Sequence, residues 1–423
     1  MRQAVTRDTT TMTMLDENQA AIQSFPMRRQ CPFAPPAEYA QLREEAPLAR
    51  VMLPSGRTAW VVTRHAEAQQ VLADPRISTD ITRPGFPALT PETPESARKR
   101  GRLHEGEFFN VDPPEHDVYR RMLIPEFSVK RVKAMRPGIQ TVVDRLIDEM
   151  LSGGPPADLI ESFGQPVPSM VICQLLGVAY EDHVFFQSRI RNRKMVTVAG
   201  ETALARAAIA EIRAYLDDVV TRAEQEPGDN LVGRLVTERL ATGELSHNAL
   251  VGMIHQLLIA AHETTHNMIP LGVLTLLRHP GQLAELRADP ALWPGAVDEL
   301  LRYHSIVDGA GFARVAIEDI EIGGQLIRAG DGVFVLTASA NHDERSFERP
   351  DDLDIHRGAR NHLAFGYGVH QCLGQNLGRA WLEIAYETLF RRVPGLRAAV
   401  EVDDLPFKYD TAIFGMYEFP VAW

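Results

Sequence analysis

The segment from Phe365 to Gly374, which reads Phe-Gly-Tyr-Gly-Val-His-Gln-Cys-Leu-Gly, places the strongest constraint on this chain. Its Cys372 stands immediately before a predicted helix, in a loop that contains three glycines. Glycine allows positive φ and lets the backbone approach a flat object closely. A helix N-terminus favours negative charge, and its free N–H groups can point at the sulfur, so both effects favour a thiolate. Such a sulfur is a suitable ligand for soft or redox-active iron.

A lone cysteine has other interpretations, namely a buried structural side chain, a catalytic nucleophile or a zinc ligand. Zinc requires clustered Cys or His partners, and none stand at a suitable spacing. The chain has only three cysteines, Cys31, Cys173 and Cys372, which are far apart. An odd count makes a poor disulfide framework and indicates a reducing compartment such as the cytoplasm.

Hydrophobic periodicity predicts a mainly α protein with small β-sheets. Helical spacing dominates residues 115–302, and a last helix is expected over 373–392. Strand patterns occupy 48–53, 58–62, 317–322 and 332–336, and the proline-rich residues 84–94 predict a long loop. The sequence suggests a flexible leader over 1–30 and one domain over 31–423, with no signal peptide or membrane span.

Two motifs precede the cysteine loop. Glu263, Thr264 and Thr265 interrupt a long apolar helix predicted over 247–278, where threonine hydroxyls can bond back to carbonyls and bend the helix. Glu299 and Arg302, three positions apart, share a helix face. A solvated helix face and an ordinary surface ion pair are the simpler interpretations.

The cysteine loop resembles the signature of the cytochrome P-450 superfamily, through Phe365, Gly368, His370, Cys372 and Gly374. The resemblance implies the triangular-prism fold of that family, with haem b between a central distal helix and the proximal cysteine loop. It implies that Cys372 is the axial ligand of the iron, that Phe365 packs on the proximal side, and that His370 faces a propionate.

The resemblance extends to the earlier motifs. The stretch from Ala260 to Thr265 looks like the oxygen-binding turn of the distal helix, with Thr264 as the hydroxyl that contacts dioxygen and Glu263 as the acid that feeds protons. Ala261 departs from the family's usual glycine, and its methyl group is expected to narrow the groove over the haem. The family would also pair Glu299 and Arg302 with a later arginine, here Arg357, in a buried structural cluster.

Haem propionates need cationic or donor groups. His116 and Arg120 lie one helical turn apart in a segment that resembles the family's early propionate-binding helix, and Arg314 matches another propionate partner. An exposed helix pair and an arginine at a strand end are the alternatives.

The resemblance implies a monooxygenase that inserts one atom of O2 into a C–H bond or alkene of a mainly apolar small molecule, such as a polyketide-like secondary metabolite or a xenobiotic. Other family chemistry (ring closure, coupling, peroxide-driven oxidation), a non-catalytic haem sensor, and an interaction protein without haem remain alternatives. Predicted substrate-pocket residues are Phe86, Leu89, Phe109, Phe185, Val196, Leu258, Ala261, Val307, Phe312, Ile413 and Phe414.

A soluble ferredoxin and an NAD(P)H-dependent reductase are the expected electron donors. The net charge of −12 argues against nucleic acid or an anionic membrane as the main partner. A local basic cluster is nevertheless expected to receive an acidic ferredoxin; its members are Arg120, Arg121, Lys130, Arg131, Lys133 and Arg136.

Overall fold

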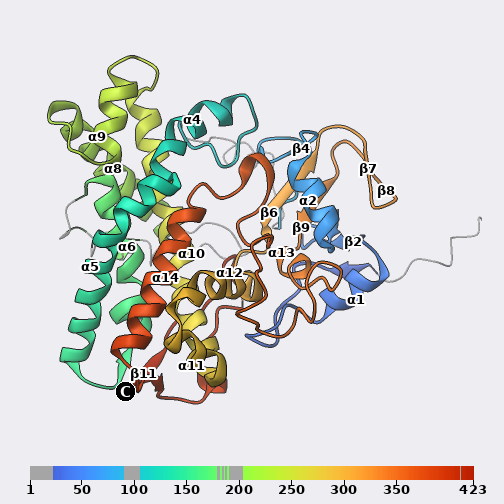
Figure 1. Cartoon of the computed structure of the whole chain (residues 1–423). Helices are drawn as coiled ribbons and strands as arrows, with labels where there is room; N and C mark the ends of the chain where they lie inside the picture. Colours follow the sequence, from blue (N-terminus) through green and yellow to red (C-terminus); the bar gives the residue numbers. More distant parts are fainter. Residues whose placement is uncertain are drawn as a thin grey trace, which may run out of the picture.

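The computed structural model of this chain describes residues 22–89, 105–178, 182, 185, 188–189, 203–409 and 411–423. Figure 1 shows a helix-rich part beside a smaller part that holds most of the strands. The α-helices of the described residues are α1 (Glu38–Glu45), α2 (His65–Ala73), α4 (Glu115–Leu123), α5 (Val129–Gly153), α6 (Pro166–Leu176), α8 (Ala203–Gln225), α9 (Leu231–Leu235), α10 (His247–Arg278), α11 (Pro280–Ala288), α12 (Trp293–His304), α13 (Thr337–Ala340) and α14 (Gln375–Arg392).

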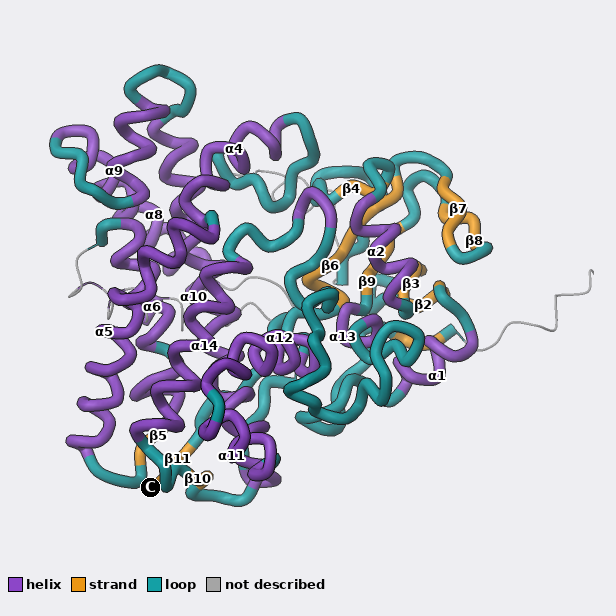
Figure 2. The backbone as a smooth tube through the Cα atoms, in the orientation of Figure 1, coloured by secondary structure: helices purple, strands orange, loops and turns teal. Residues whose placement is uncertain are grey.

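The strands are short, as the sequence predicted, and lie mainly on the right of Figure 2. They are β1 (Gln23–Ser24), β2 (Leu48–Met52), β3 (Thr58–Val62), β4 (Ile77–Ser78), β5 (Ala157–Asp158), β6 (Gly309–Ala316), β7 (Ile320–Ile322), β8 (Gln325–Ile327), β9 (Gly332–Val335), β10 (Arg397–Ala398) and β11 (Pro420–Ala422). The main sheet has the order β1-β2-β3-β9-β6-β4, in which β3 and β9 are parallel.

The central helix α10 coincides with the predicted range 247–278. Ser246 fixes its start, because the hydroxyl accepts a hydrogen bond from the N–H of Ala249. Apolar residues occur around most of the circumference of α10, so the helix is buried against α6, α8 and α14. In Figure 1 the red α14 runs beside α10 in the middle of the molecule.

The predicted strands and the last helix are confirmed within one to three residues, except that only 320–322 of the range 317–322 form a strand. The loop predicted over 84–94 contains no helix or strand as far as Leu89, and residues 90–94 lie outside the described part of the chain.

The flexible leader was predicted to extend too far. Residues 1–21 lie outside the described part, but β1 pairs in parallel with β2, and the ring of Phe25 packs 4.6 Å from that of Phe334. Arg29 donates a hydrogen bond to the carbonyl of His304 at 2.7 Å. Residues 22–30 therefore belong to the fold, because strand pairing at the sheet edge, the buried ring of Phe25 and the hydrogen bond of Arg29 hold this segment. Among the described residues no helix combines the length and apolarity that crossing a membrane requires.

Candidate active site

The cysteine loop is held in a tight conformation at the start of α14. The N–H of Cys372 donates to the carbonyl of Phe365 at 2.8 Å, which closes the loop upon itself. Gly366 and Gly368 have φ values of +68° and +72°, and a Cβ on Gly368 would lie 2.5 Å from the carbonyl oxygen of Leu72 in α2. Side chains larger than hydrogen are therefore excluded at Gly368 both by conformation and by space.

The Cys372 thiol opens onto a cavity and is closely surrounded by protein on its other sides. Burial raises its pKa, while the N–H of Gly374 and the charges of Arg120 and Arg379 act in the opposite direction. Arg120 also donates to the carbonyl of Gln371 at 2.6 Å, which fixes the cation beside the loop. The donor and the two cations thus favour the charged form of the sulfur and oppose the effect of burial.

The cavity, of about 400 Å³, lies between α10 and the cysteine loop. One wall comes from α10, through Ala260, Ala261 and Thr264, and the opposite wall from residues 364–365 and 370–374. The remaining lining is mainly apolar and comes from Phe109, Asn110, Phe127, Ile172, Leu257, Thr265, Met268, Leu301, Ile306, Val307, Gly311, Phe312, Leu377, Gly378, Trp381 and Leu382, together with the cationic residues described next. The size and character match those of cofactor sites.

Basic side chains gather at one part of this cavity, which His116, Arg120, Arg314 and His370 all line. The rings of His116 and His370 lie 4.2 Å apart. Burial lowers the pKa of Arg314 to about 10, and burial together with the neighbouring His116 and Arg314 lowers the pKa of His370 to about 3. Bringing these groups together disfavours their positive charge, so the cluster favours an anionic ligand such as a carboxylate pair.

The turn of α10 that faces the cysteine loop is polar. The hydroxyl of Thr264 donates to the carbonyl of Ala260 at 2.8 Å, and the amide of Asn267 donates to the carbonyl of Glu263 at 2.7 Å. Both bonds tie side chains to helix carbonyls, the arrangement by which threonine bends a helix. Ala261 lines the cavity, so its methyl group occupies space that a glycine would leave open.

Glu299, Arg302 and Arg357 lie together in the protein interior. Arg302 donates to both carboxylate oxygens of Glu299 at 2.7 and 2.8 Å, and both side chains are fully buried. Arg357 donates to the same carboxylate at 3.1 and 3.2 Å. The N–H of Asp354 also donates to it at 3.0 Å, so every member of this charged cluster has bonded partners.

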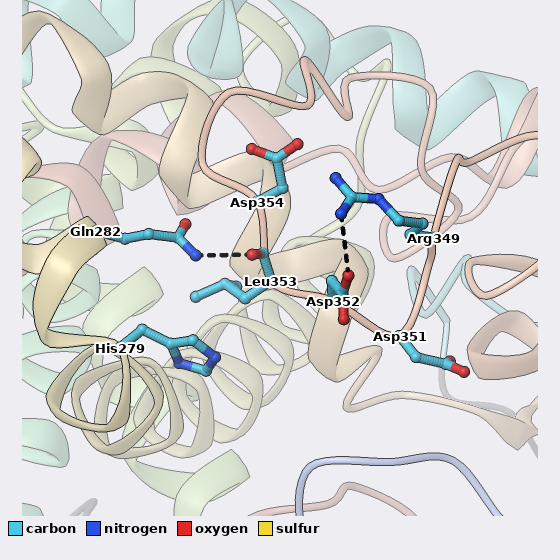
Figure 3. Close-up of a pocket in the computed structure, with 7 residues that line it drawn as sticks. All are labelled: His279, Gln282, Arg349, Asp351, Asp352, Leu353 and Asp354. Carbon is cyan, nitrogen blue, oxygen red and sulfur yellow. Dashed lines mark hydrogen bonds and ion pairs between the residues drawn. The ribbon is translucent and has the colours of Figure 1, made fainter.

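A second hollow, of about 430 Å³ (Figure 3), lies beside residues 351–354, and the backbone of this segment bonds to Arg302 and Glu299 of that cluster. It is lined by His279, Gln282, Arg349 and residues 351–354. Gln282 donates to the carbonyl of Leu353 at 2.7 Å, and Arg349 pairs with Asp352 at 3.6 Å. The side chains of Asp351, Asp352 and Asp354 point in different directions (Figure 3). The described residues contain no group of three or more His, Cys, Asp or Glu able to hold a metal ion. The hollow therefore lacks the features of a cofactor site.

The predicted substrate-pocket residues fall into two groups. Phe109, Ala261, Val307 and Phe312 line the cavity. The others that can be placed are not among its lining residues, and they are Phe86, Leu89, Phe185, Leu258, Ile413 and Phe414. Val196 lies outside the described residues.

The second group was misplaced because tertiary contacts use those side chains elsewhere. Phe414 is buried, with the guanidinium of Arg29 lying 4.5 Å from its ring centroid. Phe185 packs against Tyr215. Leu258, on α10, is buried in the main core and stands at the edge of the cavity-facing side of the helix.

The remaining three were misplaced for the same reason. Phe86 is buried outside the cavity and Leu89 packs against the core around Phe25. Ile413 forms a bridge to Val307 and packs on the main core, so it supports a lining residue without lining the cavity itself.

Sequence reasoning missed several cavity residues, among them Asn110, Ile172, Leu257, Met268, Ile306 and Trp381. A usable signal exists for Leu257, which stands four positions before Ala261 and therefore on the same helix face. Asn110 directly follows the predicted Phe109. Ile172 comes from α6, and only the packing of α6 on α10 brings it to the cavity.

Comparison with known proteins gives consistent matches. The family model described as "Cytochrome P450" matches residues 292–393. Pentalenic acid synthase of Streptomyces avermitilis is 52% identical over 400 residues, which is 95% of this chain and 97% of that protein. Vitamin D3 dihydroxylase of Streptomyces griseolus is 52% identical over 401 residues, with the same coverage. The crystal structure of cytochrome P450 MoxA from Nonomuraea recticatena is 50% identical with a TM-score of 0.88, covering 95% of this chain and 98% of that one.

Proposed function

The chain belongs to the cytochrome P450 family and is a haem-thiolate monooxygenase; from that premise we propose that it holds haem b and oxidises a large, mainly apolar small molecule. The observation that carries the proposal is the position of Cys372 at one wall of an apolar cavity whose opposite wall contains Thr264. A thiolate ligand, a largely apolar cavity and a basic cluster for two carboxylates are the requirements of an iron porphyrin.

The residues present fit that cofactor. Cys372 would bind the iron, and His116, Arg120, Arg314 and His370 would hold the propionates. When bound, haem supplies the reductive activation of dioxygen, by which one oxygen atom enters the substrate and the other leaves as water.

The protein supplies proton delivery and orientation. Thr264 carries a hydroxyl at the cavity wall, and Glu263 stands next to it with its side chain half-buried, so the pair can hold and pass protons at this turn. Phe365, at the opposite wall, packs beneath the guanidinium of Arg379 at 4.6 Å from its ring centroid, which keeps a cation on the proximal side of the loop.

The substrate class follows from the lining. Phe109, Ile172, Leu257, Val307 and Phe312 present apolar surface to the cavity, so an apolar ligand gains the hydrophobic free energy of their burial. Two relatives are named for their action on vitamin D3 and for making pentalenic acid. We therefore propose a polycyclic or macrocyclic secondary metabolite or a comparable xenobiotic. The expected ordering of residues 84–109 over the ligand falls mostly on residues 90–104, which lie outside the described part of the chain.

A ferredoxin and an NAD(P)H-dependent reductase in the cytoplasm are the proposed electron source. Arg121, Lys130 and Lys133 are exposed on α4 and α5, as the predicted docking cluster requires. The other three members are less available: Arg120 is held by the carbonyl of Gln371, Arg131 pairs with Glu126, and Arg136 pairs with Glu383. Arg121 bonds only to the carbonyl of Asp117 on its own helix and stays exposed. The cluster available to a partner is therefore narrower than the sequence suggested.

The decisive experiment is a screen of terpenoids, steroids and macrolides for the substrate-induced spin-state shift of the purified holoprotein. Each ligand that shifts the spectrum is then turned over with a surrogate ferredoxin and reductase, and oxygen uptake is compared with product. One oxygen consumed per product that carries one added oxygen atom supports monooxygenation. Dehydrogenated or ring-closed products without added oxygen, or turnover with peroxide alone, would favour the alternative chemistries. No turnover of any ligand that shifts the spectrum would favour a sensor.

A further inference from the structure

The loop of residues 105–110 contacts α10 through the backbone atoms of both segments. Gly106 has a φ of +82°, and a Cβ placed on it would lie 1.9 Å from the carbonyl oxygen of Ala249. A Cβ on Gly252 would lie 2.0 Å from the carbonyl oxygen of Glu105. Two glycines, one on each partner, therefore let the loop and the helix touch backbone to backbone.

The side chain of Gln256 completes this junction. Its Oε1 accepts hydrogen bonds from the N–H groups of Phe108 at 2.9 Å and Phe109 at 3.2 Å. Gln256 stands one helical turn before Ala260, so it shares the face of α10 that lines the cavity further along. Phe108 is fully buried and packs edge-on against Phe109, with ring centroids 5.0 Å apart.

The same loop is tied to a second helix. Oε1 of Glu107 accepts from Nη1 of Arg213 in α8 at 3.0 Å and lies 3.1 Å from Nδ1 of His255 in α10. The loop is thus fixed at Glu107 to two helices and at Gln256 to the cavity-facing side of one. Since Phe109 lines the cavity directly after these contacts, its position depends on them.

We propose that Gln256 is a specificity-determining positioning residue, which holds Phe109 at the cavity wall and thereby sets which bulky ligands fit beside Ala260 and Thr264. The ligand-binding test of this proposal rests on the proposed haem-dependent function. The hydrogen bonds from the N–H groups of Phe108 and Phe109 to Gln256, which we call the clamp, do not depend on haem. Gln256 itself is not among the cavity-lining residues, so its effect on ligands passes through Phe109.

Two variants separate the hydrogen bonds from the space that the side chain fills. Gln256→Met keeps the length and removes the acceptor, which leaves two backbone N–H groups without it. Gln256→Glu keeps an oxygen acceptor in the same place. Gln140→Met is the matched control, because Gln140 bonds to Asp144 and Thr388 in the α5–α14 contact and does not line the cavity.

The first test is hydrogen exchange of residues 105–110 in each full-length protein. We expect the amides of Phe108 and Phe109 to exchange at least about tenfold faster in Gln256→Met, and to be protected again in Gln256→Glu. Unchanged exchange in Gln256→Met would overturn the clamp. This result does not depend on whether the protein oxidises anything.

The second test uses two nitrogen ligands of haem iron in the holoprotein, imidazole and 4-(biphenyl-4-yl)imidazole. Imidazole needs space only at the metal, whereas the biphenyl group has to share the cavity with Phe109. We expect Gln256→Met to raise the dissociation constant of the biphenyl ligand about five- to tenfold and leave that of imidazole within about twofold, with Gln256→Glu restoring the parent value. Equal changes for both ligands, or the same change in Gln140→Met, would show a general loss of structure and contradict the role. Absence of any spectral response to imidazole in the parent protein would instead count against the haem-dependent function.

Discussion

Arg357 and Glu299 are 58 positions apart in the chain, and their side chains meet in the protein interior, where Nε of Arg357 donates to Oε1 of Glu299 at 3.1 Å. Arg302 binds the same carboxylate from within α12. One buried carboxylate is therefore shared by two guanidinium groups, and it joins α12 to the segment that leads into the cysteine loop.

Replacement of Arg302 by methionine should destabilise the protein by about 3–5 kcal/mol, because it leaves the charge of Glu299 buried with one partner fewer. Arg345→Met is the control, since Arg345 pairs with Asp343 from an exposed position and its loss should cost less than about 1 kcal/mol. Denaturant unfolding of the two variants measures the difference. Equal destabilisation would show that the Glu299 cluster contributes no more than a surface ion pair.

Replacement of Cys372 by serine should abolish the red-shifted band of the reduced carbon monoxide complex, because an alcohol does not supply a thiolate to the iron. Cys31→Ser and Cys173→Ser are the controls. Cys31 is exposed, whereas Cys173 lies on α6 in the hydrophobic core, where burial raises the pKa of its thiol to about 12. Both controls should keep the band. A band retained in Cys372→Ser would remove this residue as the ligand.

Replacement of Thr264 by alanine should leave haem and substrate binding intact and uncouple turnover. The hydroxyl at the cavity wall is lost, so protons are no longer held there in the right place and reducing equivalents are released as hydrogen peroxide. NAD(P)H consumed, peroxide and product are measured together, and we expect the fraction of NAD(P)H that yields product to fall about tenfold or more. Thr265→Ala, at the adjacent cavity position, is the control. Unchanged coupling in Thr264→Ala would exclude its hydroxyl from the mechanism.

Charge reversal of Lys133 should slow reduction by an acidic ferredoxin, with the largest effect at low salt, because exposed charges steer association over about 10 Å at 0.1 M ionic strength. Lys133 is exposed on α5. Arg328→Glu is the control. Arg328 is exposed directly after β8, and its replacement should leave the rate of reduction unchanged. Stopped-flow reduction at several salt concentrations measures the effect. Equal rates for Lys133→Glu and the parent would place the docking surface elsewhere.

The sequence by itself determined the local features of this protein. The cysteine loop, the range of α10, the short strands and the Glu299–Arg302 pair depend on residues close together in the chain, where glycine conformation, helical spacing and alternation act directly. The resemblance of that loop to a known family extended the prediction to distant partners such as Arg357.

Only the tertiary structure decided which side chains line the cavity. Phe414 and Leu258 have the same apolar character as Phe109 and Leu257, but Phe414 lies under Arg29 and Leu258 packs in the main core. Gln256 is an ordinary polar residue in the sequence; it gains its role because two glycines bring residues 105–110 within reach of α10. Such contacts join segments about 150 positions apart, and their geometry follows from how whole helices and loops pack, which local patterns do not encode.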